Sequence, residues 1–98
     1  MLTGKQRSWL KRLAQDTPVT VYIGRSGLTE TIRHEFENGF ESRELVKAKI
    51  QQGSELDPAE TANLLARELR AEFVQAIGRK FILYRRSRRR KEHIELPE

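Results

Sequence analysis

The sequence of 98 residues contains no cysteine and only two histidines. Disulfide bonds and thiolate metal sites are therefore excluded, and no second histidine lies near His34 to complete a metal or acid–base site. The apolar runs are too short to cross a bilayer, and residues 1–5 lack the apolar core of a signal peptide. We find no nucleophile–base set and no phosphate loop of the G-x-x-x-x-G-K-[ST] kind. These absences disfavour an enzyme and predict a soluble cytoplasmic protein with no cofactor, metal, small-molecule substrate or membrane partner.

Positive charge is in excess: 19 Lys and Arg stand against 14 Asp and Glu, which gives a net charge of +5 and a pI near 10.0. Such a balance informs about partners rather than fold. Nucleic acid is the commonest polyanion available to a small basic protein, and an acidic membrane or an acidic protein is the alternative. The length suits one domain with a modest core, and we expect a monomer.

Apolar periodicity and turn residues predict an α/β domain in the order α-β-α-β-α-β-β. Thr3 and Gln6 form a capping box for the first helix, and Asp57-Pro58 starts the third. The predicted elements are a helix over 3–14, a strand over 19–23, a helix from Leu28 that closes at Asn38-Gly39, a strand over 44–50, a helix over 57–71 and strands over 73–77 and 80–85.

Two connections constrain how these strands pair. The strand–helix–strand unit over 19–50 favours a parallel pair, whereas the two-residue loop Gly78-Arg79 favours a type II′ hairpin. Together they predict a mixed four-stranded sheet with helices packed on it. We expect Trp9 in the core, and Lys47 and Lys49 on the solvated side of their strand.

The loop Gly24-Arg25-Ser26-Gly27 lies between the first strand and the second helix. Glycine allows close backbone approach and positive φ, and the start of the following helix offers free N–H groups to an anion. With the charge of Arg25, this loop could grip a phosphodiester backbone. The simpler interpretation is a strand-to-helix turn that needs glycine.

Two further basic segments extend this prediction. Lys5, Lys11 and Arg12 would add to the basic surface if the first helix docks beside the loop. A tail over residues 86–98 follows a domain over 1–85, and it repels itself unless an anion binds it. Its candidate phosphate contacts, together with the residue before it, are Arg85, Arg86, Arg88, Arg89, Arg90 and Lys91. Tyr22 and Tyr84 could each stack on a base or pack on the sheet, and Ile94 and Leu96 could fix the tail to the domain.

Several blocks of the sequence, in order over nearly the whole chain, form a recognisable set: LTGKQR (2–7), LKRLA (10–14), PV (18–19), GRSGLTE (24–30), ELVKAKI (44–50), VQAIG (74–78) and LYR (83–85). These blocks resemble the bacterial YhbY-like proteins, single-domain members of the CRM (chloroplast RNA splicing and ribosome maturation) family. The arginine-rich tail is more basic than the short end typical of the family.

The resemblance implies a compact α/β domain similar to the C-terminal domain of translation initiation factor 3. It also implies RNA binding through a KH-like G-x-x-G loop and a neighbouring basic surface, and association with precursors of the large ribosomal subunit. The alternatives are a general RNA-binding adaptor, a ribosome-bound protein-interaction module without an assembly role, and a DNA-binding module, although no recognition helix is evident.

Overall fold

The computed structural model describes residues 1–98 and confirms the predicted order of three helices and four strands. None of the helices has the length and hydropathy needed to span a lipid bilayer. The elements are α1 (Gly4–Gln15), β1 (Val19–Ile23), α2 (Glu30–Arg43), β2 (Leu45–Ile50), α3 (Pro58–Leu69), β3 (Glu72–Ile77) and β4 (Lys80–Tyr84).

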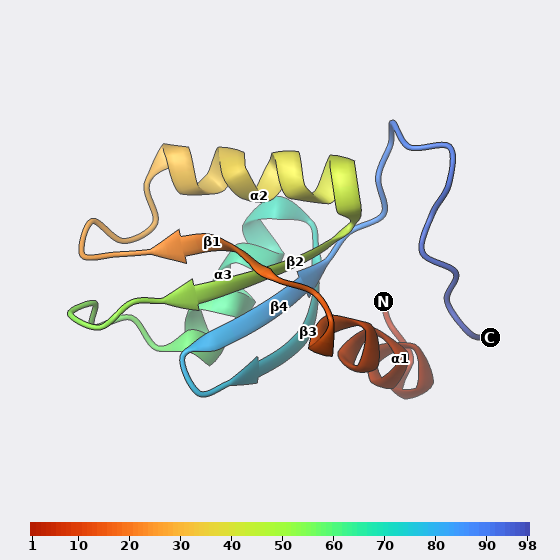
Figure 1. Cartoon of the computed structure of the whole chain (residues 1–98), viewed down its shortest axis with the longest axis horizontal. Helices are drawn as coiled ribbons and strands as arrows, with labels where there is room; N and C mark the ends of the chain where they lie inside the picture. Colours follow the sequence, from red (N-terminus) through yellow and green to blue (C-terminus); the bar gives the residue numbers. More distant parts are fainter.

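The four strands form one mixed sheet in the order β1-β2-β4-β3 (Figure 1). β1 and β2 are parallel, as the strand–helix–strand spacing predicts, and β4 is antiparallel to both of its neighbours. The β3–β4 hairpin turns through Gly78 and Arg79. Gly78 has a φ of +60° whereas Arg79 has no positive φ, as in the predicted type II′ turn.

The larger core lies between one face of the sheet and helices α2 and α3. Alternate residues of β2, Val46, Ala48 and Ile50, are fully buried in it. The ring of Phe36 from α2 stacks on that of Phe81 from β4, with centroids 5.9 Å apart. Burial of this apolar surface is the main force that holds the two helices to the sheet.

The smaller core lies on the opposite face, where α1 packs. Leu10 and Ala14, one helical turn apart, contact a cluster that includes Leu45, Ile82 and Tyr84. Tyr84 is buried there, so it serves packing, and Ile94 and Leu96 of the tail pack on the same cluster as predicted.

The prediction that Trp9 is a core residue is wrong. Its side chain is 36% exposed, because the buried stripe of α1 runs through Leu10 and Ala14 and leaves Trp9 at the margin. The Arg12 guanidinium lies 5.6 Å from the centre of the indole ring, a cation–π contact on the helix surface.

The prediction that Asn38-Gly39 closes the second helix is also wrong. α2 continues to Arg43 and ends at Glu44, which has a φ of 70° and donates its N–H to the Gly39 and Phe40 carbonyls. Gly39 is buried inside the helix, and a Cβ at this position would lie 2.7 Å from Cγ2 of Val46. The glycine therefore allows α2 to lie close on β2 rather than ending the helix.

Lys47 differs from the prediction of a solvated side chain. It is half-buried, and its Nζ donates to the carbonyl oxygen of Ala14, 3.1 Å away, at the C-terminal end of α1. A cation at this end of a helix satisfies a free carbonyl and interacts favourably with the helix dipole. Lys49, two residues further on, is exposed as predicted.

Candidate nucleic-acid interface

The glycine loop is a tight turn at the carboxyl end of β1. The N–H of Gly27 donates to the carbonyl oxygen of Gly24 at 3.1 Å, which places Arg25 and Ser26 at the exposed tip. Neither tip residue donates its own backbone N–H to a carbonyl of the protein. Gly27 has a φ of +73°, which favours glycine, whereas a Cβ at Gly24 would meet Gln51 Oε1 at 3.4 Å. The loop thus presents unpaired donors to a ligand.

The second helix starts later than the sequence pattern predicts. α2 begins at Glu30, and Thr29 is its N-cap, whose Oγ1 accepts a hydrogen bond from the N–H of Ile32 at 3.2 Å. Arg33 donates to the carbonyl of Leu28 and forms an ion pair with Glu68 at 2.8 Å. These contacts fix the segment between the loop and α2, and this segment in turn limits the movement of the loop tip.

A neighbouring loop, residues 51–56, supports Arg25. The N–H of Gln51 donates to the carbonyl oxygen of Ile23 at 2.9 Å, and Arg79 Nη2 donates to the carbonyl of Gln51 at 2.6 Å. Gly53 has a φ of +96°, and a Cβ there would lie 3.1 Å from Nε of Arg25. The Arg25 side chain therefore rests on Gly53 while remaining exposed to a ligand.

Helix α1 lies at the other end of the sheet from the glycine loop (Figure 1). β1 separates the two, and five residues of strand span about 16 Å. Lys5 and Arg12 are exposed and Lys11 is half-buried. The structure therefore does not bring the predicted helix and loop contacts into one continuous site.

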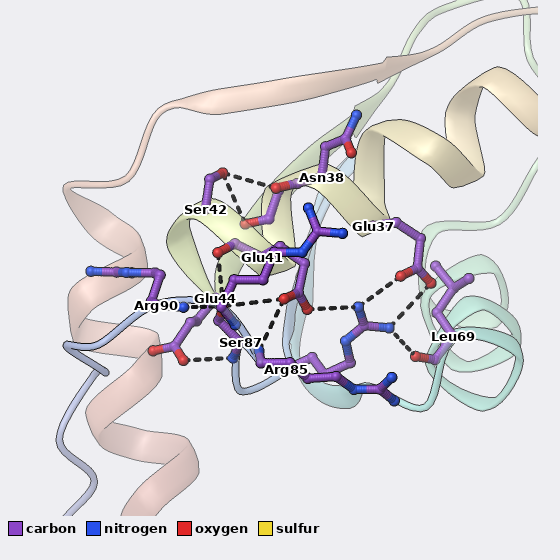
Figure 2. A network of polar contacts seen from close by, with 12 residues as sticks. Glu37, Asn38, Glu41, Ser42, Glu44, Leu69, Arg85, Ser87 and Arg90 are labelled. Carbon is purple, nitrogen blue, oxygen red and sulfur yellow. Dashed lines mark hydrogen bonds and ion pairs between the residues drawn. The ribbon is translucent and has the colours of Figure 1, made fainter.

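Arg85 is held inside the protein. Its Nη2 lies 2.7 Å from Glu37 Oε2 and 3.3 Å from Glu41 Oε2, and its Nη1 donates to the carbonyl of Leu69 at 2.8 Å (Figure 2). The guanidinium also lies 4.9 Å from the ring centre of Phe40. The hydrogen bond with Glu37 is the largest of the influences that raise the pKa of Arg85. Its charge is thus committed to contacts within the fold.

The tail folds back on the domain through its main chain. Glu41 Oε1 accepts the N–H of Arg88 at 2.9 Å, and Glu44 Oε2 accepts the N–H of Ser87 at 2.7 Å (Figure 2). Further along, Glu44 Oε1 accepts the N–H of Ile94 at 2.7 Å. The side chains of Arg86, Arg88, Arg89 and Lys91 are exposed, and that of Arg90 is half-buried. The acidic groups thus fix the backbone while the basic side chains project outward.

Sequence patterns did not single out Glu44, although it is fully buried and organises the tail. Its partners Ser87, His93 and Ile94 lie more than 40 positions away, with separations of 43, 49 and 50 residues. The only local signal was its place between a helix and a strand, which does not distinguish a solvated glutamate from a buried one.

Known proteins are similar to this chain over nearly its whole length. A model of the CRS1 / YhbY (CRM) domain matches residues 2–85. The chain belongs to this family. The Probable RNA-binding protein YqeI of Bacillus subtilis is 34% identical over 97 residues, which cover 99% of this chain and 100% of that protein. An RNA-binding protein of Haemophilus influenzae is 38% identical over 96 residues, which cover 98% of this chain and 95% of that protein.

A solved structure supports the fold. The solution structure of the hypothetical protein SAV1595 from Staphylococcus aureus, described as a candidate RNA-binding protein, matches with a TM-score of 0.80 and 36% identity. The match covers 99% of this chain and 100% of that one. The single α/β domain with three helices and a mixed four-stranded sheet is therefore shared with a structure whose sequence is clearly related.

Proposed function

We propose that this CRM domain binds RNA, and that it does so in the assembly of the large ribosomal subunit. The observation that carries RNA binding is the glycine loop: two backbone N–H groups without a carbonyl partner and an exposed arginine lie together at its tip. Backbone N–H groups and arginine are the usual donors to phosphate oxygens. The names of the Bacillus and Haemophilus relatives support the same ligand class.

In this proposal the protein contacts the phosphate backbone at both ends of the sheet. Gly24, Arg25, Ser26 and Gly27 form the contact at one end. At the other end the contacts come from exposed or half-buried basic side chains of α1 and the tail, which are Lys5, Lys11, Arg12, Arg86, Arg88, Arg89, Arg90 and Lys91. Phosphate contacts position a protein on RNA without reading its sequence, so the shape of the RNA would select the site.

The loop is tested with the double substitution Gly24→Asp plus Gly27→Asp, which places two negative charges where phosphates would bind. The positive φ of Gly27 means that the substitution also strains the turn, so we expect RNA affinity to fall while the helices and the sheet are retained, as judged by circular dichroism. The matched control is Ala59→Asp plus Asn63→Asp, which adds the same charge at exposed positions of α3. Equal affinity of the two folded variants would remove the loop from the binding site.

The ribosomal role is tested by ultraviolet crosslinking in cells, followed by sequencing of the attached RNA. Crosslinks concentrated in a few segments of large-subunit ribosomal RNA are the expected result for an assembly factor. Crosslinks scattered over many unrelated RNAs would leave a general RNA-binding adaptor, and the assembly role would be abandoned.

A further inference from the structure

One row of side chains crosses the whole sheet at the end where the glycine loop lies. The strand register pairs Tyr22 of β1 with Lys49 of β2, Lys49 with Lys80 of β4, and Lys80 with Ile77 of β3. Residues paired in this way point to the same face of a sheet. The row, which we call the Tyr22 row, therefore presents an aromatic ring, two ammonium groups and an aliphatic side chain side by side.

Every member of the Tyr22 row is exposed. The Tyr22 side chain is 52% exposed and Ile77 is 61% exposed, and both lysines are also exposed. The next pairs toward α1 differ: Ile82 is buried opposite the half-buried Lys47, and Tyr84 and Leu45 beyond them are also buried. Helix α1 thus covers this face at one end and leaves the Tyr22 row open at the other.

The Tyr22 row borders a pocket whose lining side chains can form hydrogen bonds. Besides Tyr22 and Lys49, the pocket is lined by Gln51, Gln52 and Arg79, and it contains no acidic residue. Only Ile23 separates Tyr22 from Gly24 along the chain, so the row begins close to the glycine loop.

These features match the chemistry of a single-stranded nucleic acid. An unpaired base stacks on an aromatic ring, and flanking cations attract its phosphates. In an A-form duplex the base faces are stacked on one another and are closed to such a contact, so only unpaired bases in loops, bulges and single-stranded ends qualify.

We propose that the Tyr22 row is a second binding subsite, in which an unpaired RNA base stacks on Tyr22 while Lys49 and Lys80 contact the adjoining phosphates. The subsite rests on the RNA-binding function proposed above and sharpens it: the preferred ligand carries unpaired nucleotides next to the segment held by the glycine loop. Stacking tolerates any base, so the subsite selects unpaired structure rather than sequence.

The test compares two fluorescein-labelled probes, a short mixed-sequence single-stranded RNA and a blunt-ended duplex of the same sequence. Tyr22→Leu removes the aromatic face from a half-exposed strand position, and Tyr22→Phe is the matched control because it keeps the ring. We expect Tyr22→Leu to weaken single-strand binding about 5- to 150-fold, Tyr22→Phe to stay close to wild type, and duplex binding to change little in both. Circular dichroism verifies the fold of each variant.

A second measurement does not depend on a variant that folds. Wild-type protein crosslinked by ultraviolet light to the single-stranded probe is digested and analysed by mass spectrometry. We expect fragmentation of the adduct peptide to place the nucleotide on Tyr22 itself. An adduct on the glycine loop with none on Tyr22 would contradict the subsite.

The outcomes separate the two proposals. Wild-type affinity of Tyr22→Leu for the single strand, or an equal loss on the duplex, would overturn the subsite, and the loss in the Gly24→Asp plus Gly27→Asp variant would still support RNA binding. If the wild-type protein binds neither the single-stranded probe nor the duplex, RNA binding and the subsite are both overturned.

Discussion

The Glu44 carboxylate lies 2.5 Å from Nδ1 of His93 and also accepts the main-chain N–H groups of Ser87 and Ile94. A fully buried glutamate thus holds the tail at two places. Burial has the largest single influence on the pKa of Glu44 and raises it, but the hydrogen bonds from His93, Ile94 and Ser87 together outweigh burial and lower the pKa. The ionised carboxylate is therefore the form that the fold stabilises.

Glu44→Gln removes this charge but keeps the size of the side chain. We expect the free energy of unfolding to fall by about 1–3 kcal/mol, since hydrogen bonds to a charged group are among the stronger ones. We also expect trypsin to cleave faster after the tail arginines. The control is Glu92→Gln, which removes the same charge from an exposed tail residue. Equal cleavage rates in the two variants would show that Glu44 does not hold the tail.

Acid should release the tail of the wild-type protein. The pKa of Glu44 is lowered on folding, so its contribution to stability is fully present above the pKa of an unfolded glutamate, about 4.3, and is lost as the pH falls through the lower folded value. The amide signals of Ser87 and Ile94, followed by NMR during a pH titration, should shift together with a midpoint below about 4.3. A midpoint at or above that value would contradict the assignment.

Arg85 and Arg86 are neighbours in sequence but should behave differently. Arg85→Ala leaves Glu37 and Glu41 without their shared cation, and Glu41 has a side chain that is only 19% exposed. We expect a loss of about 1–3 kcal/mol in the free energy of unfolding, measured with urea. Arg86→Ala changes an exposed side chain and should stay within about 0.5 kcal/mol of wild type. A loss in Arg85→Ala no larger than that in Arg86→Ala would mean that the ion-pair network contributes little stability.

Gly39→Ala should destabilise the protein even though alanine favours helix. The added Cβ would lie 2.7 Å from a methyl group of Val46, which is β-branched and fully buried. We expect a loss of about 1–3 kcal/mol. Val46→Ala removes the opposing methyl groups, so the double variant should be more stable than the sum of the two single losses predicts. Strict additivity in this cycle would show that the two residues do not clash.

RNA affinity should depend on salt in proportion to the number of phosphates that the protein neutralises. For about four to six phosphates, the logarithm of the binding constant should fall against the logarithm of salt concentration with a slope of about −3 to −5. Replacing the basic tail residues Arg88, Arg89, Arg90 and Lys91 with alanine should make the slope shallower by about one for each phosphate that the variant no longer binds. An unchanged slope, measured by fluorescence anisotropy, would exclude the tail from the interface.

Local patterns determined most of the fold. The capping box of Thr3 and Gln6, the Asp57-Pro58 helix start and the Gly78-Arg79 hairpin all act within a few residues, and each is present in the structure. The glycine loop is also identifiable from sequence, since its turn depends on Gly24 and Gly27 themselves.

Packing across the chain decided the rest. The sequence pattern wrongly predicts a helix end at Gly39, because a glycine that accommodates Val46 looks the same in sequence as a glycine that ends a helix. Arg85 belongs to a basic run, and only the approach of Glu37 and Glu41 from α2 separates it from its exposed neighbours.

The sequence alone determined the order of elements, the basic charge and the exposed glycine loop, because these depend on neighbouring residues and on composition. The tertiary structure alone decided that α1 and the loop lie at opposite ends of the sheet, and that Tyr22, Lys49 and Lys80 share one open row. The physical reason is that the pairing of β2 with β4 and the register of the strands bring together residues from distant parts of the chain, whereas local signals encode only the β3–β4 hairpin and the parallel β1–β2 unit.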